Sequence, residues 1–163
     1  MYKFLNNNLI AIFCSLSILI LLSAYFIEYT LGYEACNLCL ISRVPYFLII
    51  VFSLFFFFFK KFKKIILILI FISFISSVLI AFYHFGIEQG FFDEALVCKI
   101  KILPSDASSS EILQQLKNNK SKSCKNVDFR MFGLSLATIN LFISLVLSII
   151  TLRNILEKNE KNK

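Results

Sequence analysis

The sequence predicts an all-α, multi-pass membrane protein: four transmembrane helices in an up-down bundle, with two extracytoplasmic loops. Apolar residues make up 58% of the 163-residue chain and charged residues only 17%, against roughly 45–50% and about 25% in soluble domains. A chain this short has too much surface to hide so many apolar side chains from water. These residues also gather in four runs, each long enough for the roughly 20-residue helix that crosses a bilayer.

The four runs define the helices expected in a single membrane domain, residues 1–163. They cover about residues 9–27, 40–59, 65–83 and 131–152. The first run carries no charge, and no convincing cleavage site follows it, so we expect a retained helix rather than a signal peptide. In the second run, Pro45 lies slightly deeper than the first turn, which predicts a local kink or a later helix start.

Basic residues predict the orientation of the bundle. In a four-span protein nine of the seventeen Lys and Arg residues fall on one side: Lys3, Lys60, Lys61, Lys63, Lys64, Arg153, Lys158, Lys161 and Lys163. Such an excess is typical of cytoplasmic loops, so we expect both termini in the cytoplasm and the loops at about 28–39 and 84–130 outside. The net charge of +7 therefore fits a membrane surface rather than nucleic acid, for which no separate basic face remains.

The long second loop is the largest polar segment. Its Ser108–Glu111 run fits a capping box that would start a short helix with Ile112, Leu113 and Leu116 on one face. A solvated linker is the alternative.

Four of the five cysteines fall in the outer loops. Cys36 and Cys39 form a C-x-x-C motif where the second helix begins, and helix N-termini stabilise thiolates. Arg43 follows Cys39 by four residues, so both would lie on one helix face and the guanidinium would favour the Cys39 thiolate. Cys14 lies within the first run and is interpreted as a small buried apolar side chain.

The outer cysteines allow three kinds of chemistry: a zinc site, two inert structural disulfides, or a redox relay between Cys36–Cys39 and Cys98–Cys124. Zinc sites prefer paired short spacings, which Cys98 and Cys124 lack; no metal is predicted. A relay needs a terminal electron acceptor, and the chain has no haem, dinucleotide or iron–sulfur motif. A lipid-soluble quinone needs only an apolar cleft with a few polar groups, among which Arg43 would stabilise developing negative charge.

With these motifs in this order, the sequence resembles the bacterial disulfide bond formation protein B (DsbB) family. Besides the four-span order, three segments carry the resemblance across about residues 25–145: Cys36–Cys39 with Arg43; Tyr83–Gly90 followed by Cys98; and Cys124 with Asp128–Ala137 and Asn140. Leu40–Ser42 and Phe129 depart from residues that many relatives carry, which leaves the fine placement of a quinone open.

The resemblance implies a thiol oxidase of the bacterial cytoplasmic membrane that re-oxidises a periplasmic DsbA-like, thioredoxin-fold dithiol protein. Electrons would pass to ubiquinone or menaquinone. Cys98 would form the mixed disulfide with the partner, Cys124 would exchange toward the first loop, and Cys36 and Cys39 would be the quinone-coupled pair. Cys39 would be the thiolate beside the quinone, with Arg43 as its charge partner.

Some assignments stay open at this point. His84 would bind the quinone or handle protons, or it is an interfacial histidine with satisfied hydrogen bonds; Glu88 would anchor a loop or exchange protons. Gly86, Gly90 and Gly133 are expected to permit tight turns or close helix approach. The alternatives for the whole chain are a quinone reductase like vitamin K epoxide reductase and a non-catalytic membrane assembly factor with structural disulfides.

Overall fold

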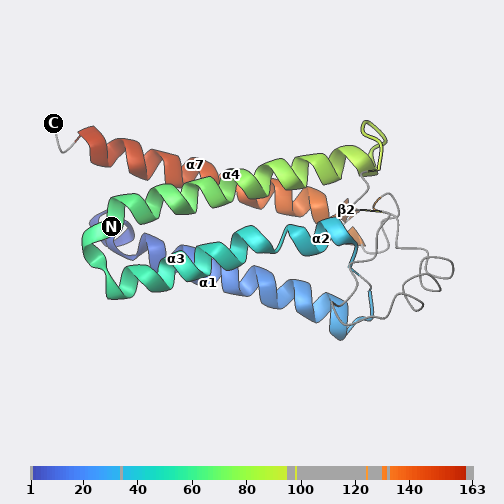
Figure 1. The fold of residues 1–163 in the computed structure, drawn as a ribbon, viewed down its shortest axis with the longest axis horizontal. Helices are drawn as coiled ribbons and strands as arrows, with labels where there is room; N and C mark the ends of the chain where they lie inside the picture. The colour runs from blue at the N-terminus through green and yellow to red at the C-terminus, as the bar shows by residue number, and fades with distance from the viewer. Residues whose placement is uncertain are drawn as a thin grey trace, which may run out of the picture.

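The computed structural model is a bundle of long helices (Figure 1), and it describes residues 2–33, 35–94, 98, 124, 130–131 and 133–160. The helices are α1 (Tyr2–Tyr29), α2 (Asn37–Ile41), α3 (Val44–Phe58), the 3₁₀ turn η1 (Lys60–Phe62), α4 (Lys63–Glu88) and α7 (Leu136–Glu160). Among the described residues, four spans are long and apolar enough to cross a membrane: Asn8–Tyr29, Asn37–Phe58, Lys60–Glu88 and Leu136–Glu157. The predicted all-α class with four membrane-spanning helices is confirmed.

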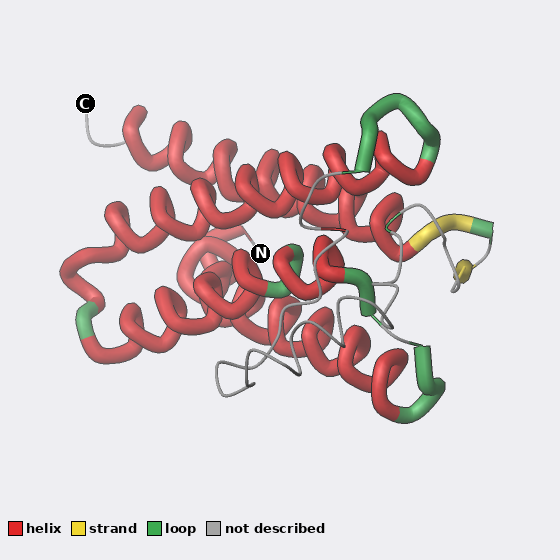
Figure 2. Tube along the Cα trace, turned by 45° about the vertical axis from the view of Figure 1, so that its right-hand side comes forward, coloured by secondary structure: helices red, strands yellow, loops and turns green. Residues whose placement is uncertain are grey.

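Successive spans run in opposite directions along the bundle. The start of α1, the turn η1 and the end of α7 lie at one end, whereas α2, the end of α4 and β2 lie at the other (Figure 1). Along its length α4 packs against α7 and α3, and α1 packs against α3. A two-stranded antiparallel ladder, β1 (Arg130–Met131) with β2 (Leu134–Ser135), leads into α7 (Figure 2).

The second span is interrupted where the sequence predicted a late start. The short helix α2 ends at Ile41, and α3 begins at Val44 with Pro45 in its first turn. Proline is tolerated there because its missing N–H would have no partner inside the helix. The Ser42 hydroxyl donates a hydrogen bond to the Cys39 carbonyl oxygen at 2.8 Å. The break therefore leaves α2 as a separate turn that carries the C-x-x-C motif.

The third span extends further than expected. α4 continues to Glu88 rather than ending near residue 83, so His84 and Glu88 lie one helical turn apart instead of in the outer loop. The fourth helix begins later, at Leu136, because Gly133 turns the chain with φ = 81° between β1 and β2. The short helix expected at 108–116 lies outside the described residues.

The bundle interior away from the cysteines is mainly apolar, with buried serine and threonine hydroxyls between the apolar side chains. Ten buried side chains form one cluster, here called the hydrocarbon cluster: Leu9, Ile10, Phe13, Tyr46, Ile49, Ile66, Leu67, Ile70, Phe74 and Leu147. Phe13 and Phe74 meet edge to face with ring centroids 5.4 Å apart. Large apolar side chains such as Leu19 and Phe58 are exposed on the outside, 62% and 83% respectively, as lipid contact requires. Cys14 is buried, as predicted.

Glycine permits two close arrangements near the outer end of α4. A Cβ atom at Gly86 would overlap the ring of Phe92, so the turn after α4 folds back on the helix only because residue 86 has no side chain. Gly90 adopts φ = 78° in that turn, a conformation that other residues rarely take. These glycines are structural, as expected.

Candidate active site

The C-x-x-C motif forms the start of α2. Cys36 is the N-cap residue, and its Sγ accepts a hydrogen bond from the Cys39 backbone N–H at 3.2 Å. The two Sγ atoms lie 2.7 Å apart, both cysteines are free, and Cys36 is buried while Cys39 is partly exposed. Sulfur thus occupies the place that a serine or aspartate oxygen usually takes at a helix N-terminus, and negative charge on it is favoured.

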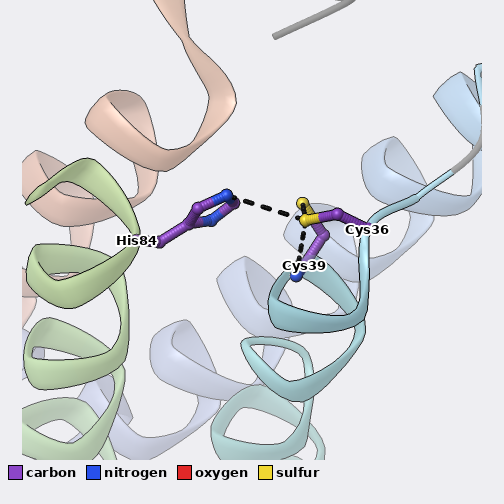
Figure 3. Close-up of side chains that lie close together, drawn as sticks. All are labelled: Cys36, Cys39 and His84. Atoms are coloured by element: carbon purple, nitrogen blue, oxygen red, sulfur yellow. Dashed lines mark hydrogen bonds between the residues drawn. The ribbon is translucent and has the colours of Figure 1, made fainter. Parts of the chain in front are cut away.

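His84 approaches this pair from α4 (Figure 3). Its Nε2 atom lies 3.6 Å from the Cys36 Sγ and 3.6 Å from Oε1 of Glu88, one turn further along the helix. The Ser135 hydroxyl donates a hydrogen bond to the other carboxylate oxygen of Glu88. A continuous polar path therefore leads from the Cys36 sulfur through His84 and Glu88 to β2.

This environment lowers the pKa of the Cys36 thiol to about 5. The largest cause is the hydrogen bond from the Cys39 side chain, and hydrogen bonding and charge from His84 and the Cys39 backbone N–H add to it, while burial opposes them. The reduced pair therefore carries its negative charge on Cys36. The sequence instead predicted a thiolate on Cys39, from the start of the second helix and from Arg43 one turn away.

Arg43 forms an ion pair with a carboxylate that its local sequence does not predict. Its Nη1 atom lies 2.6 Å from a carboxylate oxygen of Glu28 in α1, and its guanidinium stacks over the Tyr25 ring at 4.7 Å. The Arg43 side chain is only 14% exposed, so it does not extend to the interface as a solvated group. One feature of the sequence could have predicted this ion pair: Glu28 follows the first apolar run directly, and Arg43 lies near the start of the second.

The second cysteine pair lies against the first. Cys98 and Cys124 form a disulfide with Cα atoms 5.7 Å apart, and both are almost fully buried. They belong to one cluster with Cys36, Leu38 and Ile87, and Cys39 and Tyr83 pack at its edge; we call this the sulfur cluster. A backbone group of Cys124 also hydrogen-bonds to the His84 side chain. Four cysteines that are far apart in the sequence therefore share one buried volume.

Residues 6–153 match the family described as disulfide bond formation protein DsbB. The chain belongs to the DsbB family. It is also 34% identical over 149 residues to a protein of Rickettsia prowazekii (strain Madrid E) that is described as uncharacterized; the alignment covers 91% of this chain and 84% of that relative. Membership supports a role in disulfide bond formation as a thiol-disulfide oxidoreductase, and the four spans make it a multi-pass membrane protein.

In this member of the DsbB family, a cleft of about 940 Å³ opens beside the thiols. Residues of α1 and α7 form most of its apolar lining, and its polar lining includes Cys36, Cys39, Arg43, Tyr46, His84, Glu88, Cys124 and Asn140. The Tyr46 hydroxyl donates a hydrogen bond to Oδ1 of Asn140, which orients the Asn140 amide. This size and lining are typical of a site for a largely apolar small molecule.

The structure thus brings together most of the predicted site residues of this DsbB-family chain. Cys36, Cys39, Arg43, His84 and Cys124 all line the cleft, and Cys98 lies behind them, bonded to Cys124. Sequence reasoning missed Glu28 and Tyr25, which hold Arg43, and Ser135, which holds Glu88. These contacts join residues 15 or more positions apart, and no local spacing pattern predicts them.

Proposed function

We propose that this chain is a membrane thiol oxidase that re-oxidises a DsbA-like, thioredoxin-fold dithiol protein and passes the electrons to a membrane quinone. The observation that supports this most strongly is the sulfur cluster, in which a disulfide and a C-x-x-C pair share one buried site beside an apolar cleft. A protein whose disulfides are only structural requires neither a cleft at the sulfur atoms nor a thiol with a lowered pKa.

The first half-reaction is thiol–disulfide exchange at the loop pair. A thiolate of the partner attacks Sγ of Cys98, and the Cys98–Cys124 bond breaks to leave a Cys124 thiolate. The partner's second thiolate then attacks the mixed disulfide, which releases Cys98 and oxidises the partner. Two electrons have moved from the partner dithiol to Cys98 and Cys124.

The second exchange moves these electrons to the C-x-x-C pair. When Cys36 and Cys39 are joined as a disulfide, the Cys124 thiolate attacks Sγ of Cys36 and Cys39 leaves as a thiolate. Cys98 then attacks Cys124 and restores the loop disulfide, leaving Cys36 and Cys39 as the reduced pair. The packing of Cys124 against Cys36 supports this order.

The residues of the cleft fit a quinone. A bound quinone would supply the two-electron acceptor that restores the Cys36–Cys39 disulfide. Arg43 would hold an oxygen of the ring and stabilise negative charge there, while its ion pair with Glu28 fixes the guanidinium. His84, between Cys36 and Glu88, would hold a proton released by the thiols at Nε2. Apolar lining would exclude water from the reacting sulfur atoms.

We further propose that the lysine-rich end of the bundle faces the cytoplasm and the cysteine end faces the periplasm. The turn η1, which carries Lys60 and Lys61, lies at the opposite end of the bundle from α2 (Figure 1). Lysine excess at one end is the usual signal for the cytoplasmic side. The thiols would then meet a partner in a compartment where disulfides persist.

Thiol trapping in cells tests the function. With mass-shifting alkylation after acid quenching, we expect Cys36 and Cys39 to be oxidised in quinone-replete cells and reduced after quinone depletion. A Cys14→Ser variant is the matched control, since Cys14 lies outside the site and its loss should change nothing except the total thiol count. Cysteines that remain fully oxidised during quinone depletion would instead indicate a structural protein.

A further inference from the structure

The Cys36, Cys39 and His84 side chains form a compact set of metal-ligand atoms. Two thiol sulfurs and one imidazole nitrogen lie within 4.8 Å of one another. We propose that the reduced Cys36–Cys39 pair and His84 bind one thiophilic divalent cation, with Zn²⁺ as the ion that this donor set suits best. Such an ion would not be a resident cofactor, because the ligands exist only when the pair is reduced.

The donor chemistry selects the class of ion. Thiolate sulfur and neutral imidazole nitrogen are preferred ligands of Zn²⁺, whereas Mg²⁺ and Ca²⁺ require oxygen ligands. Cys36 and His84 are buried at 9% and 5% exposure, and Cys39 is partly exposed and lines the cleft. The site is therefore shielded by protein, with the cleft as an entry path.

The distances agree with a tetrahedral ion after one small movement. Ligand bonds of about 2.0–2.3 Å place sulfur and nitrogen ligands about 3.5–3.8 Å apart. Cys36 Sγ and His84 Nε2 are already 3.6 Å apart. The two Sγ atoms, at 2.7 Å, must separate by roughly 1 Å, which a rotation of the Cys39 side chain can provide because it faces the cleft.

Glu88 lies next to His84 but outside this set of three ligands. Its Oε1 atom lies 3.6 Å from His84 Nε2, and Ser135 holds the other carboxylate oxygen. Glu88 can thus hydrogen-bond to a water that completes the coordination of the ion. The carboxylate also offsets positive charge in a buried site.

The consequence for activity rests on the proposed function. An ion bound to both sulfurs would remove the nucleophile and prevent the pair from closing to a disulfide, so electrons would stop at the reduced state. Oxidation of the pair removes both thiolates and with them the site. Zinc would therefore inhibit the enzyme during turnover. It would have little effect on resting enzyme in which Cys36 and Cys39 are already joined as a disulfide.

Cobalt binding tests the site without reference to activity. The probe is Co²⁺, added to the purified, detergent-solubilised full chain carrying Cys14→Ser, Cys98→Ser and Cys124→Ser, so that Cys36 and Cys39 are the only thiols. After reduction, we expect one Co²⁺ per chain, with a sulfur-to-cobalt charge-transfer band and the visible bands of tetrahedral Co²⁺. Stoichiometric Zn²⁺ should remove these bands, and a large excess of Mg²⁺ should not.

Matched variants decide which residues form the site. His84→Ala should abolish the tetrahedral spectrum, His84→Cys should restore it with an added sulfur band, and Glu88→Gln should weaken binding about tenfold or more. Retained helical circular dichroism shows that each variant is folded. A missing Co²⁺ spectrum in the reduced parent chain, or an unchanged one in His84→Ala, would overturn the proposal.

The two proposals fail separately. If the chain binds Co²⁺ through His84 but intact protein never transfers electrons from a dithiol partner to quinone, the proposed function is wrong and the metal site stands. If intact protein turns over normally and the reduced pair takes up no Co²⁺ or Zn²⁺, the metal site is wrong and the function stands.

Discussion

The hydrocarbon cluster and the sulfur cluster are both buried in the same bundle, but burial has opposite consequences in them. In the hydrocarbon cluster, apolar side chains such as Phe13 and Phe74 pack against one another, and their burial stabilises the fold. In the sulfur cluster, burial opposes ionisation of Cys36, and local donors overcome it. The same solvent exclusion that holds helices together at one place sets thiol chemistry at the other.

Burial has different consequences in the two clusters because the sulfur cluster lies at the ends of helices. The sulfur cluster lies where α2 begins and α4 ends, so the Cys39 backbone N–H and His84 reach the Cys36 sulfur, and Glu88 reaches His84. Most of the hydrocarbon cluster is built from residues inside helices, in which backbone groups are already paired. Substitutions in the sulfur cluster should therefore change thiol reactivity with little change in the free energy of unfolding. Substitutions in the hydrocarbon cluster should change the free energy of unfolding with little change in thiol reactivity.

The largest effect is expected from Cys39→Ser in the sulfur cluster. Turnover with a dithiol partner should fall to the rate seen without the protein, because Cys36 can no longer close a disulfide with residue 39. A disulfide between Cys36 and Cys124 should accumulate instead, because the Cys36 thiolate can attack Sγ of Cys124 in the neighbouring loop disulfide and release Cys98 as a thiolate. Peptide mapping by mass spectrometry detects it; Cys14→Ser, the control, should turn over normally. If no disulfide between Cys36 and Cys124 accumulates, the proposed exchange between these two cysteines is wrong.

In the hydrocarbon cluster, Phe74→Ala should lower the free energy of unfolding by about 3 kcal/mol or more, because it leaves a cavity opposite Phe13. Denaturation in mixed micelles followed by circular dichroism measures this. The pKa of Cys36 should stay near its value of about 5 in this variant. A large change in thiol reactivity would show that the two clusters are coupled.

Arg43→Ala should reduce quinone-dependent turnover about 100-fold, the scale seen when one donor to a developing oxyanion is removed. Formation of the mixed disulfide between Cys98 and the partner should be nearly unaffected. Glu28→Gln keeps the guanidinium but removes its ion-pair partner, so a smaller loss is expected. Steady-state kinetics with varied quinone separate these effects; normal quinone-dependent turnover of Arg43→Ala would remove its assigned role.

The smallest effect is expected from His84→Ala on Cys36. Since the Cys36 pKa is about 5, its alkylation rate in the reduced parent chain should rise as the pH passes through about 5 and then level off. An ordinary thiol, with a pKa near 8.5, keeps gaining reactivity up to about pH 9. His84→Ala removes a hydrogen bond and a positive charge, which shifts the rise to higher pH. An unshifted profile would exclude His84 as a cause.

The fold was largely predictable from the sequence. A lipid-facing helix needs an uninterrupted apolar run, so four runs gave four spans, and Pro45 marked the late start of α3. The helix ends were less predictable. His84 and Glu88 read as polar loop residues, yet they extend α4 because the sulfur cluster and Ser135 give them partners there.

The residues of the candidate site could largely be predicted from the sequence, but the contacts between them could not. The C-x-x-C motif, Arg43 and His84 were identified from motif and resemblance, whereas the ion pair of Arg43 with Glu28 depends on how α1 packs against α3. A thiolate on Cys36 depends first on the hydrogen bond from Cys39 and then on His84, 48 residues away. The motif alone does not say which of its two sulfur atoms accepts the hydrogen bonds, and local spacing contains no information about the contact with His84.

The most direct test of the central claim is a reconstituted reaction of purified protein, reduced thioredoxin-fold partner and ubiquinone or menaquinone. Partner thiols and quinone absorbance are followed together. The account predicts that partner thiols disappear catalytically only when quinone is present, with one quinone reduced for each partner dithiol oxidised. Equal loss of partner thiols without quinone, or no catalytic loss with either quinone, would contradict it.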